Sequence, residues 1–151
     1  MNPVCPLLQK YGPLIARVLL AQLFIVSGAA KINAFARTAA YMASAGMPMP
    51  SVFLVLTIAL ELGGGIALVL GWRARWIAAA FFGFTFLAAV IFHPFWSAAP
   101  ANFSAQLNNF MKNLSIMSCM LYIMVYGPGP LSLSRDSCAD ASSAVSGKKK
   151  K

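Results

Sequence analysis

The sequence has few charged residues and almost no acids. Of its 151 residues, three are Asp or Glu and 10% are charged, whereas a soluble domain of average composition carries roughly 25% charged residues. Hydrophobic residues make up 60% of the chain, and the mean hydropathy is +0.74. The shortage of charge argues against a soluble enzyme and favours an integral membrane protein. The length suits a single domain.

The basic residues do not form the pattern of a nucleic-acid-binding face. The net charge is +9, but four of the twelve basic residues are the terminal run Lys148–Lys151, and the others flank apolar stretches. Nucleic-acid-binding domains gather their basic residues on one face. We therefore expect no nucleic-acid partner. The terminal lysines either attract anionic lipid, at about 1 kcal/mol each, or only solubilise the tail.

Cysteine and histidine are too sparse for a metal site or a disulfide framework. The cysteines stand at positions 5, 119 and 138 without a CxxC pair, and His93 is the single histidine. Closed zinc sites and disulfide scaffolds need closely spaced sets of such residues. We expect free thiols and no metal. The chain also lacks a haem motif, a cysteine cluster and a flavin fingerprint, so no cofactor is evident in it.

Four apolar stretches approach the length that crosses a bilayer. A spanning helix needs about 20 predominantly apolar residues, with a range near 17 to 25. The predicted helices cover residues 13–31, 51–71, 76–93 and 110–126. A signal peptide is a weaker interpretation of the first, because its apolar run begins late and three further stretches follow. We expect an all-α integral membrane four-helix bundle over residues 1–131, and a disordered basic cytoplasmic tail over residues 132–151.

The distribution of Lys and Arg predicts the orientation of this bundle. One side would hold Lys10, Arg17, Arg73, Arg75, Arg135 and the four terminal lysines. The other would hold Lys31, Arg37 and Lys112. Because cytoplasmic segments carry the excess of basic residues, both termini are predicted to be cytoplasmic. The longer connections, residues 31–50 and 94–109, would then face outward.

Glu61 lies inside the second apolar stretch, in the sequence LELGGG. At 1.5 Å per residue it is about 15 Å from the Ser51 end of its helix, near the middle of the membrane. Lys31, His93 and Lys112 would lie at the outer ends of the other three helices. An isolated charge at this depth costs at least about 2.5 kcal/mol. We therefore expect Glu61 either to pair with one of the lysines or to stay protonated.

This polar cluster has two interpretations. It is either a salt bridge that only stabilises the bundle or a ligand and proton site, since ionisable residues inside membranes are commonly functional. For a site, Glu61 and His93 are the candidate proton-handling residues. The candidate binding residues are Lys31, Lys112, Asn113 and Tyr122. His93 could instead anchor its helix end in an interfacial aromatic belt, next to Phe92, Phe95 and Trp96.

Helical spacing predicts which faces pack together. Polar stripes lie on the first helix and on the fourth, where Lys112, Ser115, Cys119, Tyr122 and Tyr126 share a face. Polar residues in membrane helices usually face the bundle, so the stripes should meet inside. Ala59, Gly63, Ala67 and Gly71 form a small-residue stripe on the second helix, which favours close packing within the bundle over a homo-oligomer contact.

Five motifs in order resemble those of the DoxX family of small four-helix membrane proteins. They are RVLLAQLFIVSGAAKI, ELGGGIALVLGWRAR, FHPFW, NNFMKNLSIM and GPGPLSLS, and the similarity covers about Arg17 to Leu133. Besides the candidate site residues, the matching positions are Arg17, Gly28, Gly64, Gly65, Gly71, Arg75, Gly127 and Gly129. The usual ending has an aromatic residue and a final acid where this chain has Leu131 and Ser134.

The resemblance implies a function linked to redox metabolism in a bacterial or archaeal cytoplasmic membrane. Relatives include membrane subunits of thiosulfate:quinone oxidoreductase. The first hypothesis is a quinone-linked redox subunit with its polar site in the outer half of the bundle, dependent on a partner subunit for electrons. The alternative is a non-catalytic membrane scaffold or assembly factor of a larger complex. Whether the chain is an enzyme stays open, because function depends on sites and not on folds.

Overall fold

The computed structural model describes residues 4–134, and within this range all regular structure is helical. The elements are α1 (Val4–Asn33), α2 (Phe35–Ser44), α3 (Pro50–Ala59), a π-helix η1 (Leu60–Gly64), α4 (Gly65–Leu70), α5 (Ala74–Phe92), a 3₁₀ turn η2 (Phe95–Ser97) and α6 (Pro100–Tyr126). The all-α prediction is confirmed. Most of the predicted tail, residues 135–151 with Lys148–Lys151, lies outside the described residues.

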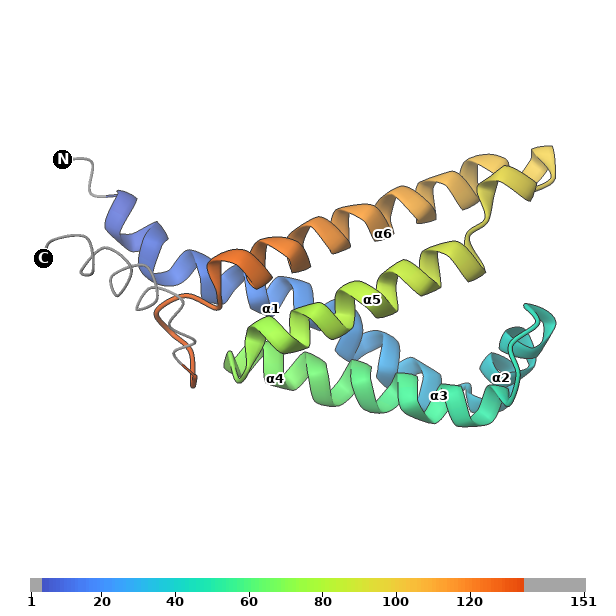
Figure 1. Cartoon of the computed structure of the whole chain (residues 1–151), viewed down its shortest axis with the longest axis horizontal. Helices are drawn as coiled ribbons and strands as arrows, with labels where there is room; N and C mark the ends of the chain where they lie inside the picture. The colour runs from blue at the N-terminus through green and yellow to red at the C-terminus, as the bar shows by residue number, and fades with distance from the viewer. Residues whose placement is uncertain (1–3, 135–151) are drawn as a thin grey trace, which may run out of the picture.

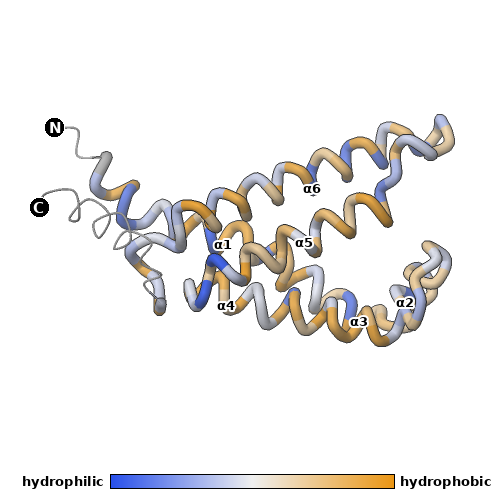
Figure 2. The backbone as a smooth tube through the Cα atoms, in the orientation of Figure 1, coloured by the Kyte–Doolittle hydropathy of each residue, from blue (hydrophilic) through white to orange (hydrophobic). Residues whose placement is uncertain are grey.

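The helices form two arms that join at one end and separate at the other (Figure 1). One arm consists of α1, α2, α3, η1 and α4, and the other is the antiparallel pair α5 and α6. The arms meet at the closed end, which we define as the 71–73 turn with residues 127–134. They diverge toward the open end, which carries α2 and residues 93–99. Apolar residues run along all the long helices (Figure 2).

Three helical segments are long and apolar enough to cross a membrane. They are Pro6–Asn33, Pro50–Leu70 and Ala74–Ser97. The longest helix of the second arm, α6, has 27 residues and is therefore about 40 Å long, but it is not among the three. Four spans with cytoplasmic termini thus stay a prediction.

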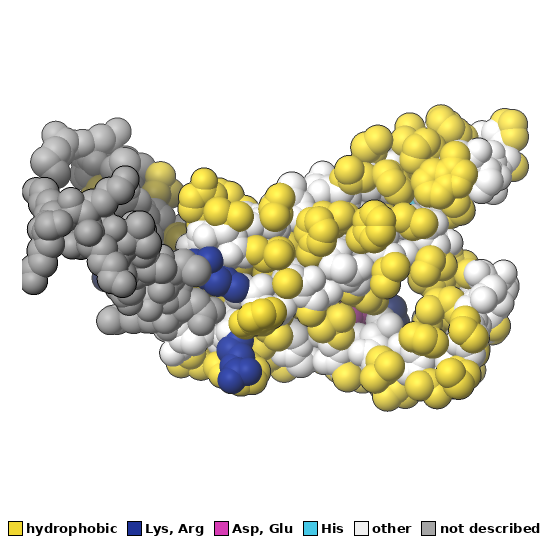
Figure 3. Space-filling view, in the orientation of Figure 1, with side chains coloured by type: hydrophobic (Ala, Val, Ile, Leu, Met, Phe, Trp, Pro, Cys, Tyr) yellow, Lys and Arg dark blue, Asp and Glu magenta, His cyan; other side chains and the backbone are white. Residues whose placement is uncertain are grey.

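The surface of these helices is largely apolar. Large side chains such as Val26, 67% exposed, and Trp76, 76% exposed, are little covered by the other residues that the structure describes. Figure 3 shows hydrophobic side chains over most of the viewed face. Soluble monomers rarely expose such large contiguous apolar areas, so this surface suits contact with lipid.

Several predicted boundaries were wrong, and a proline explains one of them. We expected the first helix to begin at Pro13, but α1 begins at Val4 and has Pro13 in its interior. The fourth helix begins at Pro100 instead of residue 110, because a proline fits the first helical turn. The connection predicted over residues 31–50 contains α2.

The second predicted helix is interrupted by the π-helix η1, whose sequence is LELGG. Short π segments inside α-helices are rare and occur frequently at functional sites. Here the segment carries Glu61 and continues directly into α4 at Gly65. A Cβ atom on Gly65 would lie 2.6 Å from Ile25 Cγ1, so α1 approaches this segment more closely than an alanine would allow.

The hydrophobic core lies in the half of the molecule toward the closed end. Its centre is a stacked pair, Phe24 of α1 and Phe81 of α5, with ring centroids 3.9 Å apart. The other buried members are Ala21, Leu68, Ala74, Ala78, Met120 and Ile123. The small-residue stripe was only partly predicted. Gly63 is exposed, whereas Gly28, Gly64 and Gly65 pack against neighbouring helices.

Arg17 stabilises the closed end from inside. Its side chain is 1% exposed and donates hydrogen bonds to the carbonyl oxygen of Leu68, at 3.4 Å, and to that of Leu131. Gly71 has a φ of 69°, and a Cβ atom there would collide with the Arg17 guanidinium. Arg17 therefore connects α1 with α4 and with the segment after α6.

Residues 132–134, which we assigned to the disordered tail, are part of the closed end. The Ser134 hydroxyl donates to the Gly71 carbonyl oxygen at 3.0 Å and accepts from the Arg73 backbone N–H at 2.7 Å. A short hydroxyl side chain bonds readily to nearby backbone groups. In this position Ser134 stabilises the turn between α4 and α5.

Arg75 stabilises the C-terminal end of α6. It donates to the carbonyl oxygens of Met124, at 2.8 Å, and Val125, at 3.0 Å, which have no partner within the helix. The motif residues Gly127 and Gly129 follow immediately. Five of the eight motif positions thus form or stabilise the closed end. Gly71, Gly127 and Gly129 lie within it, and Arg17 and Arg75 bond to it or next to it.

Candidate functional site

A cavity of about 1150 Å³ lies between the two arms toward the open end. It is comparable to the largest small-molecule sites, which are mostly apolar clefts of about 300 to 1,000 Å³ with a few placed polar groups. Its lining comes from α1, α2, α3, η1, α5 and α6 and is mostly apolar. Figure 3 shows the hollow between the arms, with an acidic side chain visible inside it.

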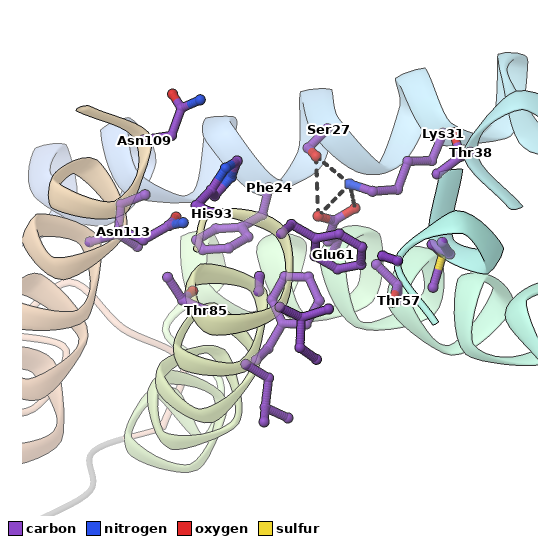
Figure 4. A pocket seen from close by; sticks show the side chains of 18 of the residues that line it. Phe24, Ser27, Lys31, Thr38, Thr57, Glu61, Thr85, His93, Asn109 and Asn113 are labelled. Atoms are coloured by element: carbon purple, nitrogen blue, oxygen red, sulfur yellow. Dashed lines mark hydrogen bonds and ion pairs between the residues drawn. The ribbon is translucent and has the colours of Figure 1, made fainter. Parts of the chain in front are cut away.

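Lys31, Glu61 and Ser27 form a compact polar triad in the cavity wall (Figure 4). Lys31 Nζ lies 2.8 Å from each carboxylate oxygen of Glu61 and donates to Ser27 Oγ at 2.5 Å. Ser27 Oγ in turn donates to Glu61 Oε1 at 3.1 Å. Ser27 and Lys31 are four residues apart on α1 and therefore share a face, and that face meets η1.

The triad is buried to different depths. The Glu61 side chain is 3% exposed, and that of Lys31 is 24% exposed. A buried carboxylate is tolerable when it is paired and hydrogen-bonded, as Glu61 is. Because Lys31 is the more accessible member, it is the one that a ligand in the cavity would meet first.

The opposite wall carries a second set of polar groups. His93 follows the last residue of α5, and its Nδ1 lies 3.0 Å from Gln106 Oε1 of α6. Asn109, Lys112 and Asn113 also line the cavity. Lys112 does not pair with Glu61; of the two lysines considered, Lys31 does so. His93 and Asn113 thus lie in the same cavity as the triad.

Tyr122, which we predicted as a candidate binding residue, does not line this cavity. It is 64% exposed, and Cys119 and Tyr126 of the same predicted stripe are exposed as well. The inward face of α6 carries Met120 and Ile123 instead. Met120 and Ile123 belong to the same buried hydrophobic cluster as Ala78 of α5, so α6 packs with this apolar face and not with the whole predicted stripe.

The cavity also holds polar residues that sequence reasoning missed. They are Thr38, Thr57, Thr85 and Asn109; Gln106 contacts His93. A lone threonine in an apolar helix is a weak signal, although Thr85 was visible as the sole polar residue within α5 after Arg75. Among residues 4–134, no three His, Cys, Asp or Glu side chains converge on a point that could hold a metal ion. The groups that do converge suit hydrogen bonding to an organic ligand.

Comparison with known proteins adds context for this geometry. Residues 12–94 match the family model described as DoxX. The chain is 37% identical over 122 residues to "Inner membrane protein YphA" of Escherichia coli (strain K12), covering 81% of this chain and 87% of that protein. It is 40% identical over 130 residues to "Inner membrane protein YqjF" of the same organism, covering 85% and 93%. No solved structure matches the chain.

Proposed function

Because the chain belongs to the DoxX family, we propose that it is a quinone-linked, redox-associated membrane subunit whose cavity binds the quinone ring. The main support for this proposal is the cavity. It is large and mostly apolar, and it has one buried, hydrogen-bonded ion pair in its wall. A lipid-soluble ring with polar oxygens needs this combination of surfaces.

The location of the protein supports this proposal. The chain is a multi-pass protein of a cytoplasmic membrane, given its inner-membrane relatives and its three membrane-capable helices. We further propose that α6 is the fourth span, since it packs along α5 in the opposite direction. The closed end, with Arg17, Arg73 and Arg75, would face the cytoplasm by the rule for basic residues. The cavity then opens in the outer half of the bilayer.

The described residues suit the proton transfers that accompany quinone reduction. A quinone becomes a quinol by taking up two electrons and two protons, and positioned side chains speed such proton transfers. Lys31 can donate a hydrogen bond to a ring oxygen by giving up one of its two contacts with the Glu61 carboxylate, and Glu61 with Ser27 can hold the proton that is exchanged. The electrons would come from a redox partner subunit. Such a subunit could pack against the exposed apolar surface of the helices. The predicted homo-oligomer and the binding of anionic lipid by the tail stay separate proposals.

The test is direct binding to the full-length protein in detergent with native lipid. Bound quinone is extracted, and a decyl-substituted quinone is titrated while tryptophan fluorescence is followed. A Trp72→Phe/Trp76→Phe background leaves Trp96 as the reporter. Trp96 lies near the open end, in edge-to-face contact with Phe95 and Phe110. Saturable quenching that weakens in Glu61→Gln and in Lys31→Met supports the proposal. The matched control is Tyr122→Phe, an exposed site away from the cavity.

A scaffold function is the alternative, favoured by one observation. The Lys31–Glu61 pair joins α1 to η1, as a purely structural salt bridge would. In that case Glu61→Gln would lower the recovery of partner proteins without any effect on quinone binding. No copurified quinone, together with identical responses from wild type and variants, would reject the quinone proposal.

A further inference from the structure

Thr85 is a buried hydroxyl that lacks a hydrogen-bond partner. Its side chain is 3% exposed and lines the cavity, and no group of the described residues bonds to its Oγ1. A helical hydroxyl usually donates to the carbonyl four residues earlier. Thr38 does so to Ala34, at 3.0 Å, and Ser115 does so to Met111, at 3.1 Å. Leaving a buried hydroxyl unpaired costs stability, so the unpaired state of Thr85 requires an explanation.

Thr85 lies at the same distance from the closed end, measured along the helices, as the Lys31–Glu61–Ser27 triad; we call this position the level of the triad. The stack of Phe24 on Phe81 shows which parts of α1 and α5 are adjacent. Both helices run from the closed end to the open end, and Ser27 and Thr85 each lie about one turn beyond the stack. The triad and Thr85 therefore occupy opposite sides of the inner part of the cavity.

Asn113 on α6 reaches the same level. The contacts of Arg75 with Met124 and of His93 with Gln106 define the antiparallel register of α5 and α6. In this register Thr85 is opposite residues near 113–115, and Asn113 also lines the cavity. Its amide offers both a donor and an acceptor. Figure 4 shows Thr85 and Asn113 on the same side, across from Glu61 and Lys31.

We infer that Thr85 and Asn113 form a second hydrogen-bonding site, which receives a carbonyl oxygen of the ligand. A ligand held by Lys31 at one edge would meet these groups with its opposite edge. The matching class of ligand is a flat ring with oxygens on opposite edges, that is, a 1,4-dicarbonyl. This inference rests on the proposed function and specifies which part of the quinone each wall recognises.

The first experiment compares a bicyclic ligand that has two opposite carbonyls with one that has a single carbonyl. A decyl-substituted 1,4-naphthoquinone and a decyl-substituted 1-tetralone are titrated into the full-length protein with Trp96 as reporter. The tetralone has one carbonyl. We expect it to bind Lys31, because a charge-assisted hydrogen bond is stronger than a neutral one to Thr85 or Asn113. Thr85→Val removes the hydroxyl at nearly constant volume, and Asn113→Leu removes the amide. Each should weaken quinone binding about five- to tenfold and leave tetralone binding unchanged.

Two further variants show whether the hydroxyl itself is responsible. Thr85→Ser restores the hydroxyl and should recover quinone affinity. Ser118→Ala removes a hydroxyl of α6 that lies outside the cavity and is already bonded to the Ser115 carbonyl oxygen, and this variant should bind both ligands like wild type. Unchanged quinone affinity in either Thr85→Val or Asn113→Leu, or an equal loss for both ligands, overturns the second site. Absence of quinone binding by the wild type overturns the proposed function itself, which is a distinct result.

Discussion

Lys31 Nζ lies 2.8 Å from both carboxylate oxygens of Glu61, and this is the one salt bridge within residues 4–134. Glu61 is also the only acid in that range. The pair joins α1 to a π-helix and forms part of the cavity wall. Its removal should therefore affect both stability and binding, and the two effects can be separated by the choice of variant.

Stability should depend on the pair as a unit. Lys31→Met leaves a buried carboxylate without its cation, and breaking a buried pair from one side costs about 3 to 5 kcal/mol. Because Lys31 is partly exposed, we expect a loss toward the lower end. The double variant Lys31→Met/Glu61→Gln should recover much of it. Thermal unfolding in detergent measures this, and losses that simply add in the double variant would contradict it.

The contact between α1 and the first residue of α4 should not tolerate an added methyl group. Gly65→Ala places a Cβ atom 2.6 Å from Ile25 Cγ1, and overpacking of this kind costs about 1 to 3 kcal/mol. The matched control is Gly63→Ala, where no atom lies within 4 Å of the new Cβ. We expect the midpoint of thermal unfolding to fall in the first variant only. Equal effects in the two variants would show that α1 does not pack here as described.

The closed end should loosen when Arg17 is replaced. Arg17→Met removes the donor for the carbonyl oxygens of Leu68 and Leu131, each bond being worth about 1 kcal/mol. Hydrogen exchange of backbone amides in residues 131–134 and in the 71–73 turn should become faster, because both segments depend on this side chain. Exchange around Thr38 in α2, at the open end, serves as the internal control and should not change.

Topology can be tested by labelling single cysteines in intact cells. In a background without Cys5, Cys119 and Cys138, Ser97→Cys should react with a membrane-impermeant maleimide from outside. Ser134→Cys should react only after the membrane is opened, because four spans place the closed end in the cytoplasm. If both positions react from the same side, α6 does not cross the membrane.

Much of the fold followed from composition and periodicity. The apolar runs predicted the positions of the long helices, since only helices satisfy their own backbone groups in lipid. Helix boundaries were less predictable, because Pro13 inside α1 and Pro100 at the start of α6 are the same residue type in two roles. The π-helix was not predictable, because its hydrogen-bond pattern depends on how η1 packs against α1.

The candidate site was also predictable from the sequence only in part. The sequence was enough to predict Glu61, Lys31 and His93 as candidate site residues, because ionisable residues are rare in apolar helices and are commonly functional there. Only the tertiary structure distinguished Lys31 from Lys112 as the partner of Glu61. It also showed that Thr85 lines the cavity and that Tyr122 does not. The physical reason is that helical spacing specifies which residues share a face, whereas the partner of that face depends on side-chain shapes on several helices at once.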